Sequence, residues 1–120
     1  MTPTIMRTSF AAMILTVAAS SLLLVEQGCA DRDGRDVYVG MGCLQCHGFR
    51  AEGLWQGPPL KHLSDRWTRE ELASYLQNPT EHMARSPRLQ ELSGRFTANM
   101  PAFTMGDRNR ERLVEYLLGL

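Results

Sequence analysis

The chain has 120 residues, with 13 Lys or Arg, 13 Asp or Glu and a formal net charge of zero at pH 7. This length is enough for one small domain with a limited core. The balanced charge argues against a nucleic-acid-binding protein, which would present a strongly basic face. Lys61 is the only lysine, so a docking surface made of a ring of lysines is excluded as well.

The first 30 residues are predicted to precede the folded domain. Arg7 is followed by an uncharged run at residues 8–25 that includes "AAMILTVAASSLLLV". A basic start followed by an apolar stretch is typical of an export signal. We therefore expect a signal or anchor segment at residues 1–30, a domain at residues 31–120 and a periplasmic location.

Three fates are open for the end of this segment. Gly28 and Ala30 satisfy the small-residue rule for cleavage after Ala30, which we favour. Acylation of Cys29, as in a lipoprotein, is the second fate, although Glu26 stands where such a site usually has an apolar residue. An uncleaved membrane anchor is the third, because the apolar run of 18 residues is long enough to span a bilayer.

The domain is expected to be all-α, because apolar residues recur at helical spacing and no strand-like alternation occurs. The predicted helices cover residues 34–46, 68–79, 86–94 and 107–120, and a loop rich in Gly and Pro covers 49–65. The last helix carries an apolar stripe, with its arginines facing out. This stripe consists of Leu113, Tyr116, Leu117 and Leu120.

Local signals also mark helix ends and a close contact. Thr68 and Glu71 form a capping box at the start of the second helix. Ser86 is a helix cap, and Pro87 takes the first helical position after it. Gly40 and Gly42 would weaken an isolated helix, so we expect the backbone near Gly40 to approach another element closely.

Two of the three cysteines and one of the three histidines lie together, as Cys43, Cys46 and His47. A Cys-x-x-Cys pair alone suits a zinc half-site, a redox dithiol or a disulfide. Zinc usually needs a second pair, which the chain lacks, and a redox dithiol usually follows a strand. The histidine directly after the second cysteine instead indicates covalent attachment of a c-type haem, with His47 as an iron ligand.

A second iron ligand would decide the chemistry. The candidates are the side chains that offer sulfur or imidazole, namely Met41, Met83, Met100, Met105, His62 and His82. Met100 is favoured because Pro101 follows it and disfavours helix there, which leaves the thioether in a pinned loop. Core filling, the usual role of Met, suits Met41 and Met105 better. The alternative of a haem with two histidine ligands stays open.

At this point the chain resembles the class I monohaem cytochromes c, particularly the small bacterial periplasmic ones. The resemblance covers residues 34–120 and follows the family order of motifs. These are "GRDVYVGMGCLQCHG", "GPPL", "REELASYLQNP", "MPAF" and a C-terminal helix ending "LVEYLLGL". The segment between Pro79 and Met100 matches the family poorly.

The resemblance implies a small all-α domain wrapped around one covalent haem c. Cys43 and Cys46 would carry the thioether bonds, and His47 and Met100 would be the axial ligands. The backbone carbonyl of Pro58 would accept a hydrogen bond from His47, which orients the imidazole.

The resemblance also implies partners for the haem periphery. Trp67 and Arg66 are our choice for the propionates, with Trp55 as a competitor for the same role. The N- and C-terminal helices would cross, with Tyr116 opposite the glycines near Gly40. The exposed haem edge would be rimmed by residues next to the thioethers and the sixth ligand, namely Leu44, Gln45, Pro101 and Phe103.

The function implied is electron transfer rather than catalysis. Two axial ligands leave no vacant position on iron. The expected partners are a donor dehydrogenase or quinol-oxidising complex and an acceptor oxidase or reductase, met through small, transient contacts. Two alternatives stay open: a haem subunit of a larger dehydrogenase or reductase, and a sensor or enzyme with an open iron site if Met100 is absent from the iron or labile.

Overall fold

The computed structural model describes residues 33–120. Its helices are α2 (Gly34–Gly40), α3 (Leu44–His47), the 3-10 turn η2 (Leu63–Asp65), α4 (Arg69–Gln77), α5 (Pro79–Arg85), α6 (Pro87–Ser93) and α7 (Asp107–Leu118). This part of the chain contains no strand, which confirms the all-α prediction.

The predictions for the export signal, its cleavage and Cys29 lie outside the described residues. Within residues 33–120, no helix has the length and apolar character needed to cross a membrane.

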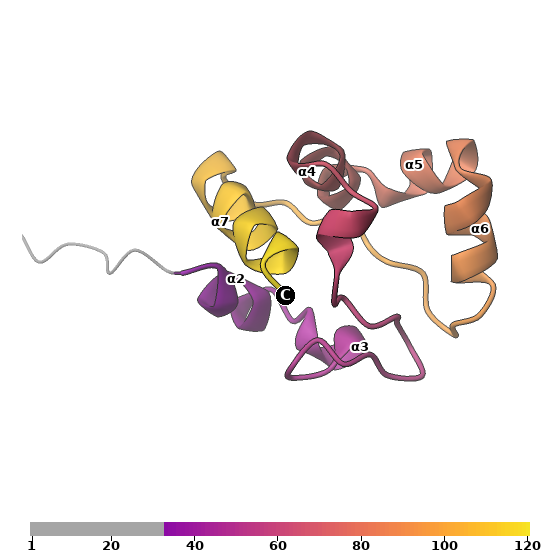
Figure 1. Cartoon of the computed structure of the whole chain (residues 1–120), viewed down its shortest axis with the longest axis horizontal. Helices are drawn as coiled ribbons and strands as arrows, with labels where there is room; N and C mark the ends of the chain where they lie inside the picture. Colours follow the sequence, from indigo (N-terminus) through magenta and orange to yellow (C-terminus); the bar gives the residue numbers. More distant parts are fainter. Residues whose placement is uncertain (1–32) are drawn as a thin grey trace, which may run out of the picture. The chain divides into compact units, whose positions relative to one another are not determined.

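The packing of α2 against α7 forms the centre of the core. Tyr38 of α2 and Leu113 and Val114 of α7 are completely buried, and all three belong to one hydrophobic cluster. The ring centroids of Tyr38 and Tyr116 lie 5.7 Å apart. Figure 1 shows α2 beside α7, with α5 and α6 on the other side of α4. The apolar stripe predicted for the last helix therefore faces the core, and Val114 extends it.

The close approach between these helices occurs at Gly34. A Cβ atom built on Gly34 would overlap the Arg112 carbonyl oxygen and the Cβ of Tyr116, whereas a Cβ on Gly40 would meet nothing within 4 Å. The prediction that placed this contact near Gly40 was therefore wrong. The prediction that Tyr116 lies opposite a glycine of the first helix was correct. The helices touch at the first turn of α2, and a sequence pattern does not show which turn lies at the crossing point.

The predicted helix over residues 34–46 is in fact two helices. Gly42 has a φ of +76°, a left-handed conformation that favours glycine. The turn at Met41–Cys43 ends α2, and the Cys43 N–H donates to the carbonyl oxygen of Tyr38 at 3.1 Å. This turn therefore separates α2 from α3, the helical turn that carries Cys46 and His47.

The second predicted helix, α4, is confirmed together with its capping box. The Glu71 N–H donates to Thr68 Oγ1 at 3.2 Å, and the Thr68 N–H donates to the Glu71 carboxylate at 3.0 Å. Leu72 and Leu76 are the buried residues of this helix. Capping starts α4 at a defined residue, so these two leucines face the interior.

Between α4 and the predicted third helix lies a further helix, α5, which the sequence pattern did not predict. α4 ends at Gln77, just before Pro79, and Pro79 itself occupies the first helical position of α5, where its missing N–H is harmless. The third helix, α6, begins after the Ser86 cap as predicted. The Gln90 side chain donates to the carbonyl oxygens of Met83 at 2.9 Å and Ala84 at 3.2 Å, which ties α6 to the end of α5.

Replacing Gly34 with alanine is expected to lower the free energy of unfolding by about 1–3 kcal/mol, because the added methyl group overpacks the contact with α7. Gly40→Ala is the matched control in the same helix and should change it by less than about 1 kcal/mol. Denaturant unfolding of both variants measures the difference. Equal stabilities would show that the helices do not meet at Gly34.

Candidate functional site

One helical turn brings the two thiols and the imidazole together. The His47 N–H donates to the carbonyl oxygen of Cys43 at 3.0 Å, and the Cys46 N–H donates to the same oxygen at 3.2 Å. Cys43 and His47 are buried, Cys46 is half-buried, and neither cysteine is in a disulfide. The spacing of the motif thus places two sulfurs and one imidazole around a single turn.

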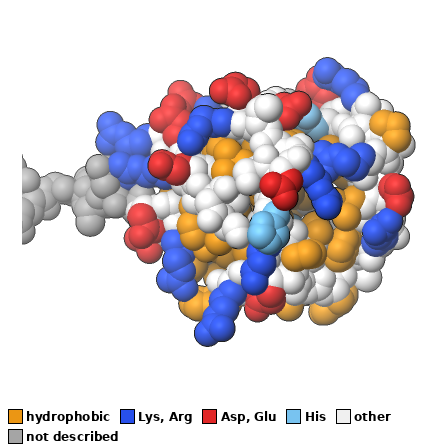
Figure 2. All heavy atoms as spheres, in the orientation of Figure 1, with side chains coloured by type: hydrophobic (Ala, Val, Ile, Leu, Met, Phe, Trp, Pro, Cys, Tyr) orange, Lys and Arg blue, Asp and Glu red, His pale blue; other side chains and the backbone are white. Residues whose placement is uncertain are grey.

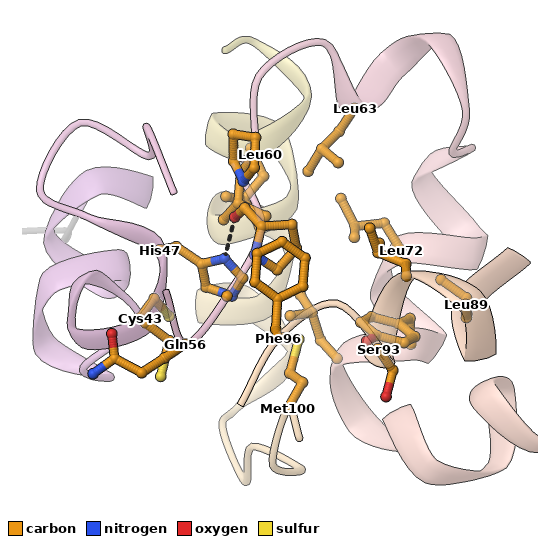
Figure 3. Close-up of a pocket in the computed structure, with 18 of the residues that line it drawn as sticks. Cys43, His47, Gln56, Leu60, Leu63, Leu72, Leu89, Ser93, Phe96 and Met100 are labelled. Atoms are coloured by element: carbon orange, nitrogen blue, oxygen red, sulfur yellow. Dashed lines mark hydrogen bonds between the residues drawn. The ribbon is translucent and has the colours of Figure 1, made fainter. Parts of the chain in front are cut away.

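The His47 ring is oriented by a backbone carbonyl. Its Nδ1 lies 2.7 Å from the carbonyl oxygen of Pro58, drawn as the dashed line in Figure 3. Because a carbonyl can only accept, Nδ1 carries the proton and Nε2 keeps its lone pair. Burial lowers the pKa of His47 and outweighs the bond to Pro58, which raises it. The imidazole is therefore neutral at neutral pH, the form that binds metal.

The loop after the motif is held so that Pro58 reaches His47. The Gly53 N–H donates to the carbonyl oxygen of His47 at 2.7 Å, and the buried Tyr38 hydroxyl donates to that of Gly48 at 2.6 Å. A Cβ on Gly57 would lie 3.2 Å from Cε1 of His47. The backbone before Pro58 therefore packs directly on the imidazole.

The surroundings of the two thiols help to distinguish cofactor attachment from the other uses of the motif, a redox dithiol and a zinc site. Burial raises the pKa of Cys43 to about 11, so its thiol stays protonated at neutral pH. A redox-active dithiol instead depends on a lowered pKa. Among residues 33–120, no group of three or more His, Cys, Asp or Glu side chains is placed to hold a metal ion. This geometry favours attachment of a cofactor over a redox pair or a closed zinc site.

A pocket of about 760 Å³ opens beside the motif, within the usual size range of cofactor sites. Much of its wall is aliphatic or aromatic, with Leu60, Leu63, Leu72, Leu76, Leu89, Leu92, Phe96 and Phe103. Figure 3 shows several of these side chains surrounding the space next to His47. All the predicted site residues line the same pocket, namely Cys43, Cys46, His47, Pro58, Arg66, Trp67 and Met100.

The candidates for the second ligand divide into two groups. Met41, Met83, Met100 and His62 line the pocket, whereas Met105 and His82 do not. His82 is engaged elsewhere, with its Nε2 at 2.8 Å from Ser74 Oγ. Met105 packs against the core, as expected for a core-filling methionine.

Met100 is held in the non-helical segment between α6 and α7. Next to it, the Phe103 N–H donates to the carbonyl oxygen of Leu76 at 3.2 Å, which anchors the segment to the end of α4. Figure 3 shows the Met100 side chain and the His47 ring at the same pocket, on different segments of the chain. The two proposed ligands therefore come from separate parts of the chain and face one space.

The two tryptophans have different surroundings. Trp67 is half-buried in the pocket wall, with its ring centroid 4.9 Å from that of Tyr75. Trp55 is 69% exposed and does not line the pocket. Of the residues expected at the haem edge, Gln45, Pro101 and Phe103 line the pocket, while Leu44 packs against the core.

Part of the pocket wall was not expected from the sequence. Leu89, Leu92 and Phe96 come from α6 and the residues after it, within the segment that resembled the family least. Leu89 and Leu92 stand three residues apart, which fits one face of a helix, but local spacing does not show what that face covers. Figure 2 shows apolar side chains at the surface between charged residues of both signs on the face viewed.

The pocket suits a bound group, because the Gln56 Oε1 atom in its wall is buried without a hydrogen-bond partner among residues 33–120.

Residues 32–120 match the cytochrome c family. No curated protein and no solved structure gives a match. The chain therefore belongs to the cytochrome c family, whose domains carry covalently bound haem c, usually one each, and transfer electrons through it.

Proposed function

We propose that this protein is a single-haem electron carrier with His47 and Met100 as axial ligands. The observation that carries the proposal is the His47–Pro58 hydrogen bond of 2.7 Å on the turn that also presents Cys43 and Cys46. Cys43 and Cys46 would form the thioether bonds, because both lie in the pocket wall beside the imidazole. Trp67 and Arg66, from the same wall, would face the propionates.

The residues around the pocket support electron transfer rather than substrate chemistry. Ligation from two protein side chains leaves iron no position for substrate. A methionine sulfur raises the reduction potential because it favours the ferrous state, and the apolar wall acts in the same direction. His47 is buried and Pro58 is half-buried, so the protein would hold the imidazole and its carbonyl partner in place beside a bound haem.

The partners proposed are redox proteins: a donor dehydrogenase or quinol-oxidising complex, and an acceptor oxidase or reductase. Contacts between such proteins are usually small and transient. Gln45, Pro101 and Phe103 line the pocket wall and would border the contact. The export signal predicted at residues 1–30 supports a periplasmic location, because c-type haem is attached outside the cytoplasm in bacteria.

The haem of the protein should stay attached after denaturation and extraction with acidified organic solvent. The double variant Cys43→Ala, Cys46→Ala should release it, because no thioether remains. Cys29→Ala, which removes the cysteine outside the motif, should retain it. Haem that leaves the unmodified protein with the solvent would contradict covalent attachment at these residues.

Met100→Ala should abolish the weak sulfur-to-iron charge-transfer band of the oxidised protein, lower the reduction potential and open reduced iron to carbon monoxide. Absorption spectra and a potentiometric titration measure these changes. Met105→Ala, outside the pocket, should alter none of them. A band that survives in Met100→Ala would make Met83 the next candidate, since it also lines the pocket. If the unmodified reduced protein binds carbon monoxide readily, the sensor or enzyme alternative replaces the carrier.

The exported protein should begin at Asp31, because Gly28 and Ala30 fit a small-residue cleavage site. Intact-mass analysis of protein isolated from the periplasm and from membranes tests this start. A diacylglycerol adduct on Cys29 would identify a lipoprotein. An intact Met1 start would identify an uncleaved anchor, which would favour a subunit of a membrane complex.

A further inference from the structure

Two loops that are distant in the sequence are joined at the rim of the pocket by Thr97 and Trp55. The Thr97 N–H and the Thr97 hydroxyl both donate to the Trp55 carbonyl oxygen, each at 3.4 Å, across 42 positions of the sequence. This pair of hydrogen bonds is the Thr97–Trp55 bridge. Each bond is long, so we expect two donors on one oxygen to hold the loops together better than one donor would.

A tight turn fixes the position of the Trp55 carbonyl. The Leu54 N–H donates to the Gly57 carbonyl oxygen at 3.0 Å, and the Gly57 N–H donates to that of Leu54 at 3.3 Å. Inside this turn, the Trp55 side chain is exposed, whereas Gln56 lines the pocket with its amide oxygen buried. Gly57 then packs on the His47 ring. The bridge therefore ends on a loop that is in contact with the imidazole.

The segment between α6 and α7 has two other anchors, and both lead back to helices. The Ser93 hydroxyl, at the end of α6, donates to the Asn99 side-chain oxygen at 3.3 Å. The Phe103 N–H donates to the carbonyl oxygen of Leu76 in α4 at 3.2 Å. Neither bond reaches the loop that follows the cysteine motif. Of these three anchors, the bridge is the one that links the segment to the histidine side of the pocket.

The bridge stands at the same distance in sequence from both sides of the proposed iron site. Thr97 comes three residues before Met100, and Trp55 comes three residues before Pro58, whose carbonyl oxygen lies 2.7 Å from His47 Nδ1. Thr97 is exposed and does not line the pocket. Any effect of its hydroxyl on the site must therefore pass through the two loops that it joins.

We propose that Thr97 is a positioning residue, whose two bonds to the Trp55 carbonyl keep the methionine segment against the histidine-side loop and so hold Met100 in place as the sixth ligand. This inference rests on the proposed ligation by His47 and Met100, and it adds what keeps the methionine from leaving. When the bridge is weakened, the segment should move away from the pocket more often and admit an external ligand.

The experiment mixes the oxidised, haem-loaded protein with imidazole. At high imidazole concentration the binding rate levels off at the rate with which the methionine sulfur leaves iron. Thr97→Val removes the hydroxyl but keeps the N–H and a side chain of similar size, so this limiting rate should rise about two- to tenfold, the effect expected for one lost hydrogen bond. Its sulfur-to-iron charge-transfer band should persist, because Met100 is still the favoured ligand.

Two further variants separate the hydroxyl from other effects. Thr97→Ser keeps the hydroxyl and should restore the rate of the unmodified protein. Thr104→Val is the matched control, because Thr104 is an exposed threonine of the same segment that does not line the pocket, and it should leave the rate unchanged. An unchanged rate in Thr97→Val, or an equal rise in Thr97→Ser, overturns the proposal.

If Thr97→Val does not fold, hydrogen exchange in the unmodified protein decides the matter. The Thr97 amide should exchange more slowly than in an unstructured chain although the residue is exposed, because its N–H is bonded to Trp55. Exchange at the unstructured rate overturns the proposal. Failure of the proposed function has a different signature, since the unmodified oxidised protein would then lack the sulfur-to-iron band.

Discussion

The hydrogen bond between His47 and the Pro58 carbonyl is the interaction on which the site depends. It determines which nitrogen carries the proton, how the ring is turned and which nitrogen keeps its lone pair. It also joins the motif turn to the following loop, which the Gly53 N–H and the Tyr38 hydroxyl hold in place. Because Tyr38 belongs to α2, the packing of α2 against α7 is connected directly to the orientation of the proposed ligand.

The rest of the domain encloses the space beside that ring. The core itself is small, consisting mainly of the α2–α7 contact and the buried face of α4. A pocket of about 760 Å³ with a mainly apolar wall is a large space for a domain of this size. A covalently held apolar cofactor would supply buried surface that so short a chain lacks, much as metals or disulfides do in other small domains.

The segment containing α5 and α6 closes the pocket on the side away from α2. Pro79 and Pro87 each begin a short helix, and the Gln90 side chain links the two. Neither helix is long enough to be stable alone, so their position depends on the burial of Pro79 in α5 and of Leu89 in α6. The same placement brings the Arg88 guanidinium to 5.1 Å from the centroid of the Trp67 ring, so the part of the chain that least resembles the family contributes to the pocket wall.

The sequence by itself determined the features that depend on neighbours within about four residues. Cys43, Cys46 and His47 share one turn because helical spacing requires it, and Thr68 with Glu71 starts α4 because their groups reach only the adjacent backbone. Contacts between distant segments needed the tertiary structure: the approach of α7 at Gly34 instead of Gly40, the position of Trp67 but not Trp55 in the pocket wall, and the exclusion of His82 and Met105 from it. Local spacing limits backbone geometry over one or two turns, whereas the meeting of distant side chains depends on how all the helices pack.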